Sequence, residues 1–395
     1  MPIQIGIGFS QDRDTTIAAL EASQQAKQQL NRDRIDCAFV FNTLHYDPKE
    51  FLPIIYDSLY NTKIIGCSTA GIILTERIET CGIGILALHS DHIKFETGYV
   101  THLDLRDCRM AGKTLAKSSL TDFGKQHRKL FLYFINSQSN PILNLSQGIK
   151  DILGEDFPVV GAGSSDDFQF EKSFQYHHNQ IITNGAVCAL LGGQLDIGMA
   201  CQHGWHPLGK PRYIDQIEGP VIKSIDGKKA LNIYEEYFPK EASTLKASSF
   251  GQINIHYPLG LRINDTDQYI LRNVRRVLDE GGIVCQDSVK MNSEVHIMIG
   301  NKDSCLNAAE NATVEVREQL NHKRPHLVLI FESLLRYKIL GRSAIKEIQF
   351  IKDVLGYPIP IFGMYSHGEI FTYKSPEIKN ETHLQNGSII VIAIY

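Results

Sequence analysis

Short apolar runs alternate with polar loops along the 395-residue chain, and they set the first expectation about its fold. Residues Cys37–Phe41 form a compact apolar run, which is typical of a buried strand. Apolar side chains then fall near helical spacing in residues 48–60. The segment "KIIGCSTAGII" follows, and after it comes a further apolar run at Cys81–Leu88. The pattern predicts a β-α-β unit whose second strand enters a tight loop and is followed by another strand.

The same order of segments occurs three times. The second copy contains "KLFLYFINS", "LSQGIKDIL", "FPVVGAGSSDD" and "NGAVCALLGG", and the third contains "HLVLIFES", "SAIKEIQFIKDVLGY", "IPIFGMYSHGEI" and "NGSIIVIAIY". In every copy an apolar pair ends at a glycine, which is Gly66, Gly161 or Gly363; five residues later stands Gly71, Asp166 or Gly368. The repeat predicts an α/β protein of two domains, built from repeated β-α-β units with mixed sheets flanked by helices.

The stretch between the second and third copies has a different composition. Within it, Asp226-Gly227 is typical of a hairpin turn, and a helix is expected to begin near Lys228. We therefore expect an N-terminal domain over residues 1–220 with two copies of the unit. A C-terminal domain over residues 221–395 would hold the third copy.

The glycine-framed loops are the best candidates for function. Glycine suits a position that needs a positive φ or a close approach of backbone to a ligand, and ligands of α/β sheets often bind at strand ends. Asn184-Gly185 and Asn386-Gly387, just before the last strands, predict hairpin turns. The alternative, that the glycines serve only turn geometry, stays open. The predicted ligand-binding residues are Gly66, Cys67, Ser68, Gly161, Ser164, Asp166, Arg336, Gly363, Tyr365, Ser366, Gly368 and Glu369.

Charge and composition narrow the classes of protein. Forty basic residues against 44 acidic ones give no electrostatic footprint for nucleic acid. The apolar runs are strand-sized and far below the roughly 20 residues of a membrane helix, and the start lacks the pattern of a signal peptide. The eight cysteines form no C-x-x-C pair, so we expect a cytoplasmic protein with reduced thiols.

Two kinds of catalytic or phosphate motif are a poor fit. A P-loop needs a lysine after its last glycine, but Ile72 follows Gly71 and Glu369 follows Gly368. Ser68 lies between glycines, yet a nucleophile elbow has the form G-x-S-x-G and turns into a helix, whereas "IILTERIE" is typical of strands. A hydrolase or thiol enzyme using Ser68 or Cys67 remains the alternative from another class.

Arg336 and Glu369 suggest a binding site for a zwitterion. A guanidinium at the end of a buried strand favours a carboxylate, and Glu369, with Asp166, could hold an ammonium group. The hydroxyls of Tyr365 and Ser366 would complete such a site. The alternative is that Arg336 and Glu369 pair with each other as a structural salt bridge. Separately, Trp205 is the only tryptophan, and we expect it to pack between domains.

Histidines raise a rival hypothesis of haem or metal. One neutral histidine suffices for a five-coordinate haem, and the candidates are His177, His178, His203 and His206. Cys201 with His203 and His206 could also bind zinc. No C-x-x-C-H occurs, which excludes a covalent c-type haem. Ordinary loop histidines are the alternative, so the cofactor stays open, with haem as the candidate.

Several of these motifs resemble those of one family. The segments "IIGCSTAGII", "VVGAGSSDD", "NGAVCALLGG", "GWHPLG" (Gly204–Gly209), the Asp226–Ala230 element, "IFESLLR" and "IFGMYSHGEI" resemble the FIST family, in both its N-terminal and C-terminal domains. The resemblance covers nearly the whole chain. One position departs from it: many relatives have a cysteine where Ser333 stands, while Arg336 is retained. Thiol chemistry of such relatives therefore does not carry over to Ser333.

The resemblance implies a role in signal transduction. It implies a cytoplasmic, non-enzymatic sensor that binds a small ligand, conjectured to be an amino acid, and passes the signal to a separate protein such as a histidine kinase of a two-component system. Some similar stand-alone members are haem-binding nitric oxide sensors. Neither nucleic acid nor a membrane is expected as a partner.

Overall fold

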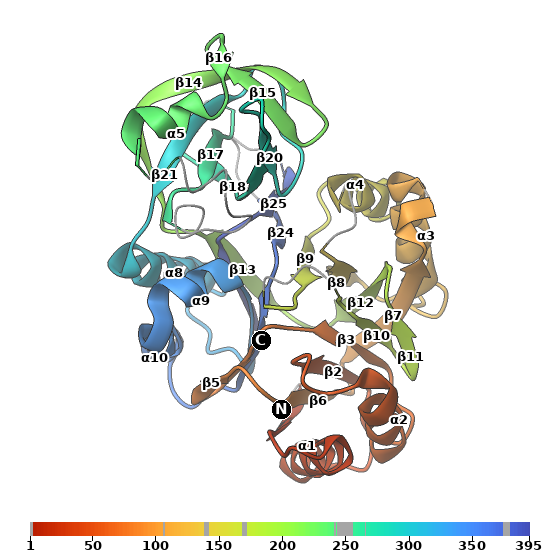
Figure 1. Ribbon diagram of the computed structural model, residues 1–395. Helices are drawn as coiled ribbons and strands as arrows, with labels where there is room; N and C mark the ends of the chain where they lie inside the picture. Colours follow the sequence, from red (N-terminus) through yellow and green to blue (C-terminus); the bar gives the residue numbers. More distant parts are fainter. Residues whose placement is uncertain are drawn as a thin grey trace.

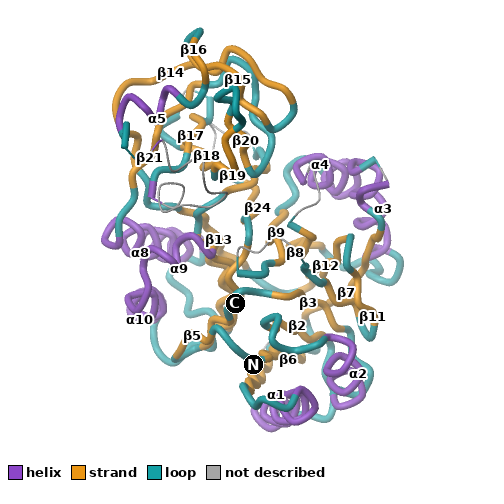
Figure 2. The backbone as a smooth tube through the Cα atoms, viewed as in Figure 1, coloured by secondary structure: helices purple, strands orange, loops and turns teal. Residues whose placement is uncertain are grey.

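The computed structural model describes residues 3–105, 107–137, 142–167, 172–240, 242, 256–264, 266–373 and 380–395. Three α/β lobes meet around a common centre, and a fourth lobe, mostly of strands, lies at one end (Figure 1). In each α/β lobe the helices lie outside and the strands inside (Figure 2). The predicted α/β class, with mixed sheets flanked by helices, is confirmed.

The first lobe contains the segments predicted from the first repeat. The predicted strand is β2 and the predicted helix is α2, which begins after Asp47, whose carboxylate accepts a hydrogen bond from Lys49 N. The elements in chain order are β1 (Gln4–Ser10), α1 (Thr15–Leu30), β2 (Cys37–Asn42), α2 (Pro48–Ser58), β3 (Ile64–Ser68), β4 (Ile72–Leu74), β5 (Arg77–Glu79) and β6 (Ile83–His89). The unit therefore starts one strand and one helix earlier than the sequence pattern indicated.

The second and third lobes repeat this order. The second comprises β7 (Ile93–Thr101), a 3-10 turn (Leu103–Leu105), α3 (Cys108–Leu120), β8 (Arg128–Asn136), α4 (Ile142–Leu153), β9 (Val159–Ser164), β10 (Gln175–His177), β11 (Gln180–Ile182) and β12 (Gly185–Gly193). The third comprises β13 (Ile197–Gln202), α8 (Lys302–Gln319), β22 (Leu327–Ser333), α9 (Leu334–Leu340), a 3-10 turn (Gly341–Ala344), α10 (Ile345–Leu355), β23 (Ile361–Ser366), β24 (Glu369–Thr372), β25 (Thr382–Gln385) and β26 (Ile389–Ile394).

The fourth lobe is inserted into the third, between β13 and α8; we call residues 206–299 the inserted domain. Its elements are β14 (His206–Glu218), β15 (Val221–Ile225), β16 (Lys228–Lys229), α5 (Asn232–Tyr237), β17 (Leu259–Arg262), β18 (Tyr269–Arg272), β19 (Val274–Val277), β20 (Ile283–Cys285) and β21 (Glu294–Ile299). Asp226 and Gly227 have positive φ and join β15 to β16, which confirms the predicted hairpin turn. The helix expected near Lys228 is α5, and it begins at Asn232 because Lys228 and Lys229 first form β16, which pairs with β15. The domain division at 220/221 stays a prediction; it falls where β15 begins, directly after the turn of Gly219 and Pro220 that follows β14.

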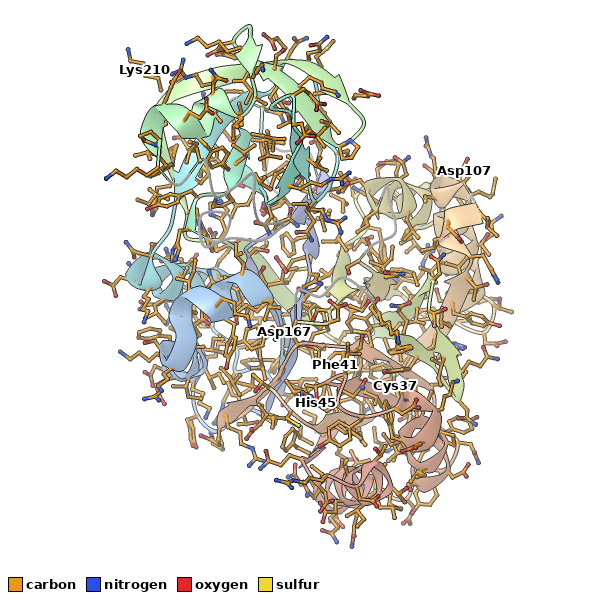
Figure 3. The ribbon with its side chains drawn as sticks, viewed as in Figure 1. Cys37, Phe41, His45, Asp107, Asp167 and Lys210 are labelled. Atoms are coloured by element: carbon orange, nitrogen blue, oxygen red, sulfur yellow. The ribbon has the colours of Figure 1, made fainter. Side chains whose placement is uncertain are left out.

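The three lobes are related by an approximate threefold arrangement. Phe41, Phe134 and Phe331 have equivalent places in the parallel strand pairs β2–β3, β8–β9 and β22–β23; their register partners are Cys67, Ala162 and Met364. The Phe134 ring packs edge to face against the rings of Phe41 and Phe331, with ring centroids 5.3 and 5.5 Å apart, respectively. In Figure 3, Phe41 lies near the middle of the molecule. The shared core is thus built from the inner faces of all three sheets.

Each lobe gives a hairpin to its neighbour. The β10–β11 hairpin of the second lobe pairs with β3 of the first, β24–β25 of the third pairs with β9 of the second, and β4–β5 of the first pairs with β23 of the third. Each of the three sheets therefore has six strands, two of which come from another lobe. This cyclic exchange makes the three lobes a single interlocked ring.

The two Asn-Gly pairs do not form the hairpins predicted for them. The strands that flank Asn184-Gly185 are β11, which pairs with β10, and β12, which pairs with β7 and β8. At Asn386-Gly387 the flanking strands β25 and β26 likewise belong to different sheets. The prediction was wrong because the hairpin before each Asn-Gly pair belongs to the sheet of a neighbouring lobe. Each pair therefore connects that sheet to the sheet of its own lobe.

The recurring strand glycines serve close packing. A Cβ at Gly66 would lie 1.9 Å from the Val40 carbonyl oxygen, and one at Gly363 would lie 2.2 Å from that of Ile330. At Gly161 the obstacle is the Tyr133 ring, 2.6 Å away. None of these three glycines has a positive φ, and the close approach that each permits is to the protein's own strand or ring, where the sequence pattern suggests a ligand.

Candidate functional site

The polar loops at the strand ends of the three lobes meet at the centre, next to the phenylalanine core. The Ser165 backbone N–H donates to the Ser68 carbonyl oxygen (3.1 Å), which joins the second lobe to the first. The hydroxyls of Thr69 and Ser165 both donate to the Tyr365 carbonyl oxygen, at 2.7 and 2.6 Å, which joins both to the third. The loops that the sequence repeat marked as candidates for ligand binding thus join the three lobes to one another.

Most of the predicted residues in these loops are sealed from solvent. Cys67, Ser68, Ser164, Tyr365, Ser366 and Glu369 are all 0% exposed. The Ser68 hydroxyl accepts a hydrogen bond from Phe174 N (3.0 Å), and the thiol of Cys67 lies 3.5 Å from the Met364 sulfur. The loops converge as predicted, but they pack against one another.

Glu369 is the most unusual group of this centre. Its Oε1 is 2.5 Å from the Ser366 hydroxyl, and its Oε2 accepts from the backbone N–H groups of Gly387 and Ser388 and from the Ser388 hydroxyl. Burial raises the pKa of Glu369 to about 7, although these donors act to lower it. The carboxylate sits among neutral donors.

Arg336 belongs to a different buried network. Its Nε donates to Glu332 (3.0 Å), its Nη1 to the His203 carbonyl oxygen (2.8 Å), and its Nη2 to the Cys305 carbonyl oxygen (2.9 Å) and to Glu347. Burial, and then the neighbouring Glu347 carboxylate, hold the pKa of Glu332 well above its usual range. The direct Arg336–Glu369 pair considered from the sequence does not form: Arg336 instead ties α9 to α8, α10 and the strand β22.

The inserted domain rests on the strand-end loops through a mixed junction. Gln286 Nε2 donates to the His367 carbonyl oxygen (2.8 Å), and Arg272 Nη1 donates to the Leu384 carbonyl oxygen (2.7 Å). Asp166 lies beside His367, with 3.8 Å between Oδ1 and Nδ1. Trp205 is buried in a small apolar cluster drawn from both sides of the junction; the cluster contains Trp205, Leu271, Met298, Cys305, Leu306, Leu335, Ile339, Leu340 and Ala344. Its predicted role in packing between domains is thereby confirmed.

Two cavities flank this junction. One, of about 680 Å³, lies between the inserted domain and the second lobe and is lined by α4, β18 and the strand β25; we call it the second-lobe cleft. The other, of about 590 Å³, lies between the inserted domain and α8 and includes Trp205, His206 and Tyr269; we call it the third-lobe cleft. A further cavity of about 820 Å³ lies between the first and second lobes and includes Tyr46 and Asn136. Each cleft is lined by residues of the inserted domain and by residues of the ring.

Sequence models of two domains match the chain. The FIST N domain matches residues 36–228 and the FIST C domain matches residues 230–372. The chain belongs to the FIST family. The FIST domains imply a sensory role in signal transduction, and in the part of the chain that the structure describes, no helix is long and apolar enough to cross a membrane.

Other similarities are more distant. The uncharacterized protein MJ1623 of Methanocaldococcus jannaschii is 24% identical over 363 residues, which cover 86% of this FIST protein and 67% of that one. A cyanuric acid hydrolase from A. caulinodans aligns over 99% of both chains at 9% identity with a TM-score of 0.36. PurLQS from Thermotoga maritima aligns over 99% of this chain and 72% of that one at 7% identity, with a TM-score of 0.23. Both TM-scores are too low to inform fold or activity.

The histidine candidates of the FIST protein do not lie together. His177 and His178 are on β10 and the turn after it, with their rings 4.0 Å apart, and they pack against Tyr99 and Tyr56. Burial lowers the pKa of both imidazoles. His203 and His206 lie at the third-lobe cleft, where His203 Nδ1 accepts from Trp205 N (2.9 Å).

These surroundings do not fit a haem or a zinc ion. The third-lobe cleft, where His203 and His206 lie, carries several amides and carboxylates, among them Gln202, Asp267, Asn301 and Asp303, which suit the apolar faces of a haem poorly. The pair His177–His178 lines none of the cavities above. No group of three metal-ligating side chains occurs among the residues placed by the structure, so the zinc hypothesis for Cys201 fails there.

The catalytic alternative finds little support in the FIST protein. Burial raises the pKa of Cys67 well above its usual range, and a buried neutral thiol is a poor nucleophile. Ser68 has a backbone N–H as its hydrogen-bond partner and no solvent-exposed surface.

Sequence reasoning missed the residues that line the second-lobe cleft. Lys150 lies on α4 and Arg272 on β18, 122 positions apart, and each is more than 95% buried. A lone cation within an apolar segment, as in "YILRNV", is the one local signal that could have drawn attention to Arg272. Their proximity depends on where the inserted domain sits on the ring.

Proposed function

We propose that this FIST protein is a non-enzymatic sensor that binds a small ligand at the junction of the inserted domain and the ring. The observation that carries the proposal is that both clefts are lined by residues from the two bodies, such as Lys150 and Arg272 in the second-lobe cleft. Their volumes, about 590 and 680 Å³, lie in the range of small-molecule sites.

A ligand in either cleft has a physical route to a signal. A ligand shifts a conformational equilibrium only if it binds one arrangement more tightly than another. The inserted domain meets the ring through the Trp205 cluster and through hydrogen bonds such as that from Gln286 to His367, and a ligand bound across them would favour one arrangement of this junction. The signal then passes to a separate signalling protein, for which a histidine kinase of a two-component system is our proposed partner.

An amino acid and a haem-bound gas are the two ligand classes suggested by the family resemblance. For the amino acid, the candidate residues from the sequence include Arg336, Glu369 and Asp166, and using them would require the ligand to displace buried contacts. For haem, the surroundings of the histidines give no support. The clefts are accessible without such displacement, and for that reason we favour them.

Thermal unfolding of the full chain with a panel of amino acids, phosphorylated metabolites and haem tests the proposal. A ligand that binds only the native state raises the unfolding temperature. We expect at least one compound to do so saturably. Ser293→Trp should reduce the shift if the second-lobe cleft is used, and Asn307→Trp should do so for the third-lobe cleft. Lys346→Trp, on the exposed face of α10, is the control and should leave the shift intact.

If no compound shifts the unfolding temperature, the sensor proposal fails. A visible absorption spectrum after haem titration decides the haem alternative separately, since bound haem gives a Soret band.

A further inference from the structure

The second-lobe cleft gathers positive charge from two separate bodies. Lys150 comes from α4 of the ring, while Arg272 and Lys290 come from the inserted domain. All three act on the same ring, His383 of β25. Burial, and then Arg272, Lys290 and Lys150 in that order, lower the pKa of His383 to about 4, so this imidazole is neutral at pH 7. Three cations therefore line one cleft together with an imidazole that carries no charge.

Arg272 is the most deeply placed of the three, at 2% exposed. Its Nε donates to the Ser288 carbonyl oxygen (3.2 Å), and its Nη1 donates to the carbonyl oxygens of Leu271 and Leu384. Nη2 has no acceptor in the part of the chain that the structure describes. No carboxylate there lies within ion-pair distance of Arg272, although Asp287 is near enough to act on it electrostatically.

Lys150 and Lys290 are also without an ion pair among the described residues. Lys150 is 4% exposed, and its Nζ donates to the Asn380 carbonyl oxygen (2.6 Å). Burial is the main cause that lowers the pKa of Lys150. Lys290 is exposed at the mouth of the cleft. A buried cation held only by backbone carbonyls is costly, so an anion in the cleft would relieve that cost.

Among the described residues, no carboxylate of the cleft forms an ion pair with these three cations, although Glu155 and Glu381 act on Lys150 electrostatically. Glu294 pairs with Arg262 and His296, which also accounts for the fourth cation of the lining. Glu155 accepts from the amide of Gln147 (2.9 Å), and Glu381 lies 3.3 Å from His383 Nε2. These groups do not neutralise Arg272, Lys150 and Lys290 by direct contact.

We propose that the second-lobe cleft binds a small metabolite through its phosphate group, with Arg272, Lys150 and Lys290 as the phosphate-binding residues. A phosphomonoester carries close to two negative charges, which matches three converging cations better than a single carboxylate does. The Nη2 of Arg272, which has no acceptor among the described residues, provides a directional donor, and the lysines provide mobile charges. Because the cations come from both bodies, the phosphate would hold the inserted domain against the ring. This inference rests on the proposed function and names its ligand class.

Thermal unfolding and calorimetric titration of the full chain with inorganic phosphate and with glycerol 3-phosphate test the assignment. Chloride at the same ionic strength serves as the reference, because exposed lysines attract any anion. We expect both phosphates to raise the unfolding temperature where chloride does not. Lys290→Gln should weaken the affinity about tenfold, the effect of losing one charge-assisted hydrogen bond. Lys346→Gln makes the same charge change on α10 and should leave the affinity unchanged.

Lys150→Met and Arg272→Met provide the second measurement. If either variant stays folded, phosphate binding should be lost while thermal unfolding remains cooperative; if both fail to fold, the Lys290→Gln and Lys346→Gln pair still decides. If the affinity for phosphate falls equally in Lys290→Gln and Lys346→Gln, or falls in neither, the assignment to this cleft is overturned. If a compound without phosphate stabilises the protein and both phosphates do not, the phosphate inference is overturned while the sensor proposal stands.

Discussion

Glu369 and Gln175 occupy the same position in two of the three lobes. Each is the first residue of a hairpin strand given to a neighbouring lobe, where Glu369 pairs with Ala162 and Gln175 with Cys67. Each side chain also contacts a serine at the end of the preceding strand in its own lobe: Glu369 lies 2.5 Å from Ser366, and Gln175 lies 2.8 Å from Ser164. One lobe thus places a carboxylic acid where another has an amide.

This equivalence predicts that Glu369→Gln stabilises the protein in a pH-dependent way. With a pKa of about 7 when folded and 4.5 as its ordinary value, Glu369 binds a proton in the folded state that it releases on unfolding between those pH values. Stability therefore falls as pH rises through this window. Glutamine does not titrate, so the free energy of unfolding of the variant should equal that of the wild type near pH 4.5. At pH 8 it should exceed that of the wild type by up to about 3 kcal/mol.

Denaturant unfolding at several pH values measures this difference. Glu310→Gln, at an exposed position of α8, is the control and should show no such trend. If the free energies of unfolding of Glu369→Gln and of the wild type differ by the same amount from pH 4.5 to 8, the assigned pKa is contradicted.

The strand glycines predict a second result. Gly66→Ala and Gly363→Ala should each destabilise the fold by about 3 kcal/mol or more, because the added methyl would meet a backbone carbonyl that cannot move aside cheaply. Gly282→Ala is the matched control, since its nearest neighbour is a Val221 methyl 3.3 Å away, and a cost below about 1 kcal/mol is expected. Chemical denaturation measures all three. Equal costs at the three positions would show that backbone entropy, and not close packing, explains the repeat.

Arg336 gives a third prediction. Arg336→Met would leave the carboxyl groups of Glu332 and Glu347 buried together without a cation, which should cost about 3–5 kcal/mol. Arg342→Met removes an exposed arginine from the following turn and should cost far less. The stabilisation by ligand should survive in the folded Arg336→Met protein, because Arg336 lies outside both clefts. Loss of that stabilisation alone would instead support the ligand-binding role that the sequence suggests for Arg336.

Periodic features of the fold were predictable from the sequence. The strand β2 and helix α2 were found because their apolar residues follow simple spacing, and the "IILTERIE" segment forms strands β4 and β5 as expected. The strand β1 was missed, although Ile5, Ile7 and Phe9 follow the alternation of a strand. Gly6 and Gly8, which lie between them, let α1 pack against the strand backbone. The local pattern therefore predicts an element where the spacing of its own apolar residues decides its structure.

Relationships between lobes could not be predicted in the same way. The Asn-Gly pairs carry the local signature of a hairpin, but the exchange of strands between lobes decides which strands pair. For the same reason, Arg336 and Glu369 looked like partners in the sequence, and tertiary packing gave each of them others. The cations of the second-lobe cleft come from α4 and the inserted domain, whose contact no local pattern encodes.

Hydrogen–deuterium exchange of the full chain, with and without a saturating amount of whichever panel compound stabilises it, tests most directly the claim that ligand binds at the junction. If the ligand uses the second-lobe cleft, the account predicts slower exchange in residues 261–264 and 288–294 of the inserted domain and in α4 and β25. If it uses the third-lobe cleft, slower exchange is expected in residues 267–269 of the inserted domain and in α8. Protection confined to residues 44–49 and 172–174, around the cavity between the first and second lobes, would contradict it.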